Sequence, residues 1–328
     1  MSKIILSLAL SCSLFSLSHS AQAQLGRTYT IGFLAGLKAP SPASGPNVDA
    51  FREGLRELGY VEGKNITIEY RWGGGNLERM PELAAELVRI KVDVIVTQGM
   101  PAVLAAKKAT STIPIVAANS DNLVEAGVVA SLARPGGNVT GSTRVDADFS
   151  VKRLELLKEV LPKLSRVAVF SHGALGGDQE ELQESRTAAR DLGIQLQSLQ
   201  IQEPNDFPNA FSEIIKRHAD ALIIITSSFT SAHRIQLIEL ATKNRLPTVC
   251  GQALWSEAGC AVSYGPNLTE LYRRAAYLVD KILKGSKPAD LPVERPRKYQ
   301  LIINLKTAKQ IGLAIPPNVL ARADRIIR

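Results

Sequence analysis

Short apolar runs alternate with amphipathic segments along most of the chain. The runs "YTIGFLAG" (29–36) and "VDVIVTQ" (92–98) have the length and continuous hydrophobicity of strands that are buried on both faces. Between such runs, "NVDAFREGLRELG" (47–59) places Val48, Phe51 and Leu55 on one helical stripe and ends at a glycine. Strands that alternate with helices predict a parallel sheet with helices on both faces.

The same succession of elements occurs twice. The segment "KVDVIVTQGMPAVLAAKKATSTIPIV" (91–116) is matched by "HADALIIITSSFTSAHRIQLIELATKNRLPTV" (218–249), with an aspartate and a proline at corresponding positions. The repeat predicts an α/β protein made of two doubly wound parallel-sheet lobes rather than one long sheet.

Three other segments carry specific expectations. The segment "LVEAGVVASLA" (123–133) is predicted to be a helix, and "PPNVLARADRII" (316–327) is predicted to be the last helix. Between the two halves, "RPGGNVTG" (134–141) has the composition of tight turns and interrupts the succession of strands and helices.

Composition and charge narrow the class of protein. A chain of 328 residues with 45% hydrophobic residues suits two globular domains. The net charge of +8 is diffuse, because Lys and Arg alternate with Glu on the predicted helices. Such mixing is typical of solvated helix faces, so no nucleic-acid partner is expected.

The first residues have the parts of a secretory signal peptide. Lys3 precedes an apolar stretch, and Ala21-Gln22-Ala23 fits a cleavage site, which predicts a signal peptide over residues 1–23 and export to the periplasm. No later stretch is apolar for long enough to cross a bilayer. In an exported chain, Cys250 and Cys260 either form a disulfide or are two buried thiols.

Small polar residues follow several strands at the edge where parallel α/β sheets bind ligands. The turn from Gln98 to Pro101 opens a helix whose N-terminus suits a carboxylate. Asp121 follows the next strand and either binds a ligand ammonium or hydroxyl group or caps a helix. The second half offers Ser171, His172, Ser227, Gln252 and Tyr264 at corresponding places.

Enzyme motifs are missing from the sequence. The mature chain has three histidines without an H-x-x-x-H pair, and there is no G-x-S-x-G motif. We therefore expect no metal, no cofactor and no catalysis. The enzyme alternative is a hydrolase in which His172 activates Ser171 or Ser227.

Long motifs carry a resemblance to a known family. The segments "FREGLRELGYVEGKNITIEYRW", "VVASLARPGGNVTG", "SYGPNLTELYRRAAYLVDKILKG" and "PADLPVERPRKYQLIINLKTAKQIGL" resemble the ABC-transporter substrate-binding proteins that include tryptophan/tyrosine-type uptake receptors. The resemblance covers about residues 28–328. It implies a type I periplasmic-binding fold with a three-segment hinge, divided into residues 28–142 plus 265–290 and residues 143–264 plus 291–328.

The resemblance also implies a function and a site. It implies a monomeric receptor that binds a small polar or aromatic molecule, either amino acid-like or another small organic anion, and delivers it to an ABC permease. A receptor for a membrane histidine kinase is the alternative within the same fold. The positions that match the family's ligand contacts are Gly36, Leu37, Gln98, Gly99, Met100, Ser120, Asp121, Ser171, His172, Ser227, Gln252 and Tyr264. Amino-acid-binding members often have Asp where this chain has Ser227, so a neutral or anionic ligand stays open.

Overall fold

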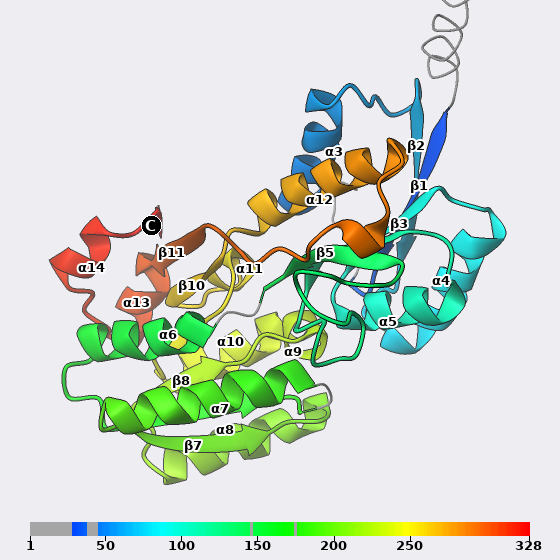
Figure 1. Ribbon diagram of the computed structural model, residues 1–328. Helices are drawn as coiled ribbons and strands as arrows, with labels where there is room; N and C mark the ends of the chain where they lie inside the picture. The colour runs from blue at the N-terminus through cyan, green and yellow to red at the C-terminus, as the bar shows by residue number, and fades with distance from the viewer. Residues whose placement is uncertain (1–27, 38–44, 145–146, 174–175) are drawn as a thin grey trace, which may run out of the picture.

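The chain forms two α/β bodies, each built on its own sheet (Figure 1). The computed structural model describes residues 28–37, 45–144, 147–173 and 176–328, so the predicted signal peptide lies outside the described residues. The first sheet has the order β2-β1-β3-β4-β5 and the second has the order β12-β11-β10-β9-β8-β6-β7. The expected pair of sheets is confirmed.

The first sheet is parallel throughout. Its strands are β1 (Tyr29–Ala35), β2 (Ile66–Trp72), β3 (Val94–Gln98), β4 (Ile115–Ser120) and β5 (Val139–Thr143). Helices α4 (Met80–Arg89) and α5 (Met100–Ala109), which follow the short η1 (Leu77–Arg79), bury one face of it. Helices α3 (Pro46–Glu57) and α12 (Leu268–Leu283) bury the other face. The continuous apolar character of these strands follows from this burial on both sides.

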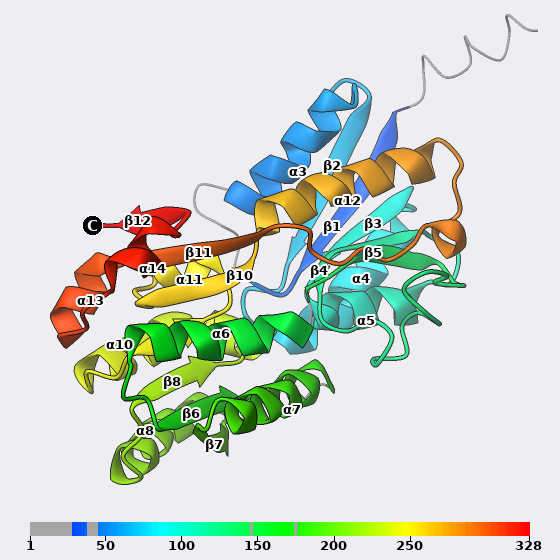
Figure 2. The same ribbon diagram turned by 60° about the vertical axis from the view of Figure 1, so that its left-hand side comes forward.

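Helix α12 comes late in the chain but packs on the first sheet. In both views it lies along α3 (Figures 1 and 2). Its Tyr272, Ala275 and Val279 are fully buried in the same apolar cluster as Phe33 of β1 and Phe51 of α3. The first body is therefore incomplete without a segment from the last fifth of the sequence.

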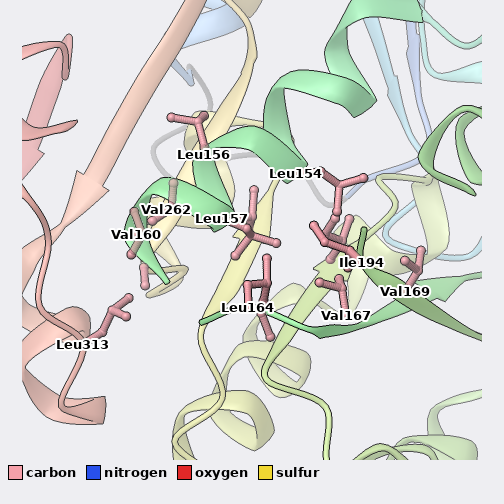
Figure 3. Close-up of a cluster of buried hydrophobic side chains, with 14 of the residues drawn as sticks. Leu154, Leu156, Leu157, Val160, Leu164, Val167, Val169, Ile194, Val262 and Leu313 are labelled. Atoms are coloured by element: carbon pink, nitrogen blue, oxygen red, sulfur yellow. The ribbon is translucent and has the colours of Figure 1, made fainter. Parts of the chain in front are cut away.

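The second sheet is parallel except at β10, which pairs with β11 in the antiparallel direction. Its strands are β6 (Arg166–Ser171), β7 (Gln195–Gln200), β8 (Ala221–Ile224), β9 (Thr248–Cys250), β10 (Val262–Pro266), β11 (Tyr299–Asn304) and β12 (Arg325–Ile327). One face is covered by α6 (Ala147–Val160), α7 (Gly176–Asp191), α13 (Leu305–Ile311) and α14 (Pro317–Ala321). Figure 3 shows Leu154 and Leu157 of α6 in this cluster with Val167 and Val169 of β6. The other face is covered by α8 (Phe207–Lys216), α10 (Arg234–Lys243) and α11 (Ala253–Glu257), while the short elements η2 (Pro204–Asp206), α9 (Ser228–Ala232) and η3 (Pro288–Asp290) lie in connections.

Three segments connect the two bodies: β5 to α6, β10 to α12, and α12 to β11. Backbone hydrogen bonds hold them side by side. Glu294 of the third segment donates to Gly141 at 2.8 Å and accepts from Thr143 at 3.0 Å, both on the first segment. Asn267 of the second segment donates to the carbonyl of Lys298 on the third at 2.9 Å. The hinge implied by the resemblance is thus one hydrogen-bonded bundle of chain crossings.

Three sequence predictions of secondary structure are wrong. The segment 123–133 makes a single turn rather than a helix, because Gly127 takes a left-handed φ of 63° and Val128 donates back to the carbonyl of Leu123 at 2.9 Å, an ending typical of a helix C-terminus. Part of the expected turn 134–141 belongs to β5. The expected last helix is only α14, and the chain then adds β12 to the sheet. No helix in the described ranges is long and apolar enough to span a membrane.

Cys250 and Cys260 are joined by a disulfide, which settles the alternative left open by the sequence. Their Cα atoms lie 6.5 Å apart, and both side chains are fully buried between β9, β10 and α11. The bond closes a short loop that contains α11.

Removing this disulfide is expected to destabilise the protein. Cys250→Ala combined with Cys260→Ala should lower the free energy of unfolding by about 3 kcal/mol, because a closed loop of roughly ten residues restricts the unfolded chain by that amount. Urea denaturation of the oxidised protein and the double variant measures the difference. Treating the double variant with a reductant should change nothing further, and equal midpoints for the two proteins would contradict the prediction.

Candidate functional site

A pocket lies where the carboxyl ends of strands from both sheets face each other. It holds about 540 Å³ of space between atoms, its opening to solvent included. Both bodies and the hinge contribute side chains. The lining residues are Gly36, Leu37, Asn47, Gln98, Gly99, Asn119, Asp121, Arg144, Thr226, Ser227, Ser228, Ser231, Gln252, Leu254 and Leu268.

The first body presents amide groups from the ends of β3 and β4. The pairing of β3 with β4 shifts register after Thr97, and the pairing of β4 with β5 shifts before Ser120. Such irregularities re-aim side chains at a sheet edge. Here they bring Gln98 and Asn119 to the pocket. Gly99 follows with a φ of 79°, and a Cβ at this position would lie 3.0 Å from Oγ of Ser228 on the second body. Glycine therefore permits both the turn and the close approach of the two bodies.

An ion pair at the hinge joins the two bodies. The guanidinium of Arg144, which directly follows β5, donates to the carboxylate of Asp121 and to the backbone carbonyl of Thr226 on the second body. Both side chains are mostly shielded, with 14% of Arg144 and 11% of Asp121 exposed. At this degree of burial, each charge depends on the other for compensation.

The second body contributes the N-terminal ends of two short helices, α9 and α11, to the pocket. Ser227 caps α9: its hydroxyl accepts from the backbone N–H of Thr230 at 3.1 Å. Gln252 precedes α11 and is 7% exposed, and Leu254 is the second residue of that helix. Both of these pocket residues lie inside the loop closed by the disulfide, which fixes their backbone.

Seven of the residues predicted from the resemblance line this pocket: Gly36, Leu37, Gln98, Gly99, Asp121, Ser227 and Gln252. The structure brings them together from five strand ends of two sheets. Their contact with a ligand stays a prediction.

The other five predicted residues lie outside the lining. Met100 and Ser120 are buried in the first body, with 1% and 0% of their surface exposed. Ser171 ends β6 and is 3% exposed. The ring of His172 stacks on Phe229 with centroids 4.3 Å apart. Tyr264 lies within β10 rather than after it, and its ring stacks on the rings of both Phe149 and Tyr299.

The sequence did not predict Arg144 as a residue of the site. Its strand, β5, consists of "VTGST" and lacks an apolar run, so nothing marked Arg144 as a residue at a strand end. Asn119 lies next to two chosen residues at the end of β4, and only the register shift, which sequence does not reveal, turns it to the pocket. The remaining missed lining residues are Asn47, Thr226, Ser228, Ser231, Leu254 and Leu268.

The structure does not place His172 and Ser227 in the arrangement that the hydrolase alternative requires. The hydroxyl of Ser227 is engaged by Thr230, and the imidazole of His172 lies flat on Phe229. Among the described residues, no group of three His, Cys, Asp or Glu side chains is placed to hold a metal ion.

A second hollow, of about 760 Å³ with its opening included, lies between α3 and β2 on the outside of the first body. Four of its charged residues form ion pairs, with Arg52 bound to Glu62 at 2.8 Å and Arg56 bound to Glu53 at 2.6 Å. It is remote from the facing strand ends, and we do not assign it as the candidate site.

Two carboxylic acids meet where the first body contacts α7. Asn122 of the first body donates to Glu180 on α7 at 2.7 Å. Glu125, on the turn after Asn122, also faces Glu180. Burial first, and then the charge of Glu180 and a hydrogen bond to it, raise the pKa of Glu125 above its ordinary value. The native protein therefore binds a proton at this pair more readily than the unfolded chain does.

The sign of the resulting pH dependence follows directly. A raised native pKa means that the charged form of Glu125 destabilises the native state. This cost is present at pH values above the raised pKa, and it disappears as the pH falls to the ordinary value of 4.5. We expect Glu125→Gln to raise the midpoint of urea denaturation at pH 7 and to lose that advantage near pH 4.5. Glu239→Gln, an exposed change on α10, is the matched control and should give the same shift at both pH values. A Glu125→Gln shift that does not depend on pH would contradict this.

Known proteins share both the sequence and the fold. Residues 40–327 match the family described as ABC transporter substrate binding protein. The tyrosine-binding protein of Clostridioides difficile (strain R20291) is 26% identical over 272 residues, which cover 82% of this chain and 78% of that protein.

Two solved structures cover 92% of this chain and 100% of their own. A conserved domain protein from Vibrio cholerae is 27% identical, with a TM-score of 0.83. An ABC domain from Streptococcus pneumonia, in complex with L-Trp, is 22% identical, with a TM-score of 0.84. At 22% identity, the similarity to the second structure concerns the fold alone.

Proposed function

Because the chain belongs to the ABC transporter substrate-binding protein family, we propose that it holds a small polar solute between its two lobes in the periplasm and passes it to an inner-membrane ABC permease. It is a binding protein and not an enzyme. We further propose that it acts as a monomer after removal of residues 1–23. The solute is retained unchanged and released at the permease.

The observation that carries this proposal is the position of the pocket. Its lining comes from both sheets and from Arg144 at the hinge. A solute bound there touches both lobes at once, so binding favours the closed arrangement over an open one. A permease can then distinguish the loaded receptor from the empty one by the spacing of the lobes.

The lobe boundaries are part of the proposal. We assign residues 28–142 plus 265–290 to one lobe and residues 143–264 plus 291–328 to the other. The packing of α12 on the first sheet and of β11 and β12 on the second supports this division.

The relatives support a ligand of modest size. One is named for tyrosine, and another was crystallised with L-Trp. We propose an amino acid-like or similarly small polar molecule for this chain, contacted by the seven predicted residues that line the pocket.

A retained solute is the direct test. The protein is purified gently from the periplasm, and mass spectrometry identifies small molecules released on denaturation. We expect one small polar compound in near-stoichiometric amount, and adding it back to stripped protein should raise the melting temperature. Asp121→Ala should lose the compound while keeping a cooperative unfolding transition. Protein that carries no compound, and whose melting temperature responds to none in a broad screen, would contradict the proposal.

The partner is tested separately. Crosslinking in intact cells, followed by capture of this chain, should recover ABC permease subunits. If a membrane histidine kinase is recovered instead, the proposed role in transport is wrong and a role in sensing takes its place. The proposal that the protein binds a solute would still hold.

A further inference from the structure

We infer that the pocket selects a hydrophilic solute that has no aromatic ring and no net charge, and that the amides of Gln98, Asn119 and Gln252 recognise it. The inference rests on the proposed function, because it concerns the solute held at the same site. It separates this chain from receptors for aromatic amino acids.

The described wall of the pocket offers no aromatic surface. Among the lining residues that the structure describes, none is Phe, Tyr, Trp or His, and the large apolar side chains are Leu37, Leu254 and Leu268. Rings near the pocket are engaged elsewhere: Phe229 stacks on His172, and Tyr264 stacks on Phe149. A planar ligand ring would find no partner for offset stacking or edge contact.

The wall instead offers amides that have no protein partner. The side-chain oxygen of Asn119 is buried and accepts no hydrogen bond, in a residue that is only 7% exposed. In the part of the chain that the structure describes, no hydrogen bond is made by the side-chain amides of Gln98 and Gln252, which also line the pocket. A buried polar group without a partner is costly, so these amides favour a ligand that supplies donors and acceptors. An aromatic side chain placed against them would leave all three unsatisfied.

The charged residues found in the lining form an ion pair. Among the residues that the structure describes, Asp121 and Arg144 are the charged ones in the lining, and they are bound to each other. A ligand with net negative charge would compete with Asp121 for Arg144 and leave a shielded carboxylate unpaired, and a cation would do the reverse. A ligand without net charge preserves the pair. Uncharged polyols and zwitterions with short polar side chains both meet this condition.

The test is a binding panel on the stripped full-length mature protein. Thermal shift and calorimetry are run with L-asparagine and L-glutamine as polar zwitterions, with erythritol and xylitol as neutral polyols, with L-tryptophan and L-tyrosine as aromatic zwitterions, and with benzoate as an aromatic anion. We expect the protein to bind either the polar zwitterions or the neutral polyols, and the group that binds identifies the class of the natural solute. The affinity for every aromatic probe should be at least about 10-fold weaker.

Variants link the selectivity to the amides. Gln98→Leu and Asn119→Leu should each weaken the binding polar probe by about 10- to 100-fold, as expected when a ligand loses one buried hydrogen-bonding partner. Gln195→Leu on β7, the same type of change at an exposed site outside the pocket, should leave affinity unchanged. The melting temperature of each variant shows that it is folded, and the use of two positions guards against one folding poorly.

Tight binding of L-tryptophan, L-tyrosine or benzoate, or no response in either polar arm, would overturn the inference. Tight aromatic binding would still leave the receptor function intact. Protein that carries no solute from the cell and responds to no probe of any kind would count against the receptor function itself.

Discussion

Arg144→Met is expected to weaken solute binding by at least about 30-fold, the equivalent of roughly 2 kcal/mol. The guanidinium of Arg144 binds the carboxylate of Asp121 in one lobe and the carbonyl of Thr226 in the other, so its loss removes the bridge that holds the lobes together. It also leaves the side chain of Asp121, which is 11% exposed, without its cation, and breaking such a pair costs about 3–5 kcal/mol. Calorimetry with the retained solute measures affinity, and small-angle X-ray scattering measures the opening of the lobes.

Two further variants make this prediction specific. Arg134→Met removes an exposed arginine of the first lobe, outside the pocket, and should change neither affinity nor the radius of gyration. Arg144→Met combined with Asp121→Asn should be more stable than Arg144→Met alone, because the second change removes the stranded charge. An Arg144→Met protein with native affinity and native dimensions would show that the bridge is dispensable.

Glu181→Leu is expected to lower the free energy of unfolding by about 3–5 kcal/mol, the usual cost of removing one partner of a buried pair. Its partner Arg153, on α6, is only 1% exposed and stacks on the ring of Phe149 at 3.6 Å. Burial lowers the pKa of Arg153, and Glu181 acts in the opposite direction. Without Glu181 the guanidinium would be a buried charge whose second terminal nitrogen already has no hydrogen-bond partner. Urea denaturation measures the loss.

The double variant distinguishes charge from packing. Arg153→Met with Glu181→Leu removes both charges and should recover most of the stability lost in the single variant. If the double variant is as unstable as Glu181→Leu, the cost comes from packing around α6 and α7 and not from the unpaired guanidinium.

Much of the fold was readable from local patterns. β1 and β3 are buried on both faces, and the sequence shows this as unbroken apolar runs. β5 was missed because its hydrogen bonds with β4, rather than side-chain hydrophobicity, make it a strand. The expected helix at 123–133 failed because Gly127 ended it after one turn.

Part of the candidate site could be predicted from the sequence, because some of its residues lie at the ends of apolar strands. Gln98 is the last residue of the apolar strand β3, and Gln252 lies two residues after the apolar strand β9, so their place at a sheet edge could be predicted. Tyr264 was placed after a strand but lies within β10 and packs on other rings. Arg144 reaches the pocket through contacts with residues 23 and 82 positions away, and no local pattern encodes such distances.

The late position of α12 sets an order for biogenesis. A ribosome that has made residues 28–143 has made every strand of the first sheet but only one, α3, of the two helices that cover one of its faces. The face that includes Phe33 and Val96 is fully covered only when residue 283 has emerged. The first sheet therefore gains its complete cover only after most of the second sheet has been synthesised.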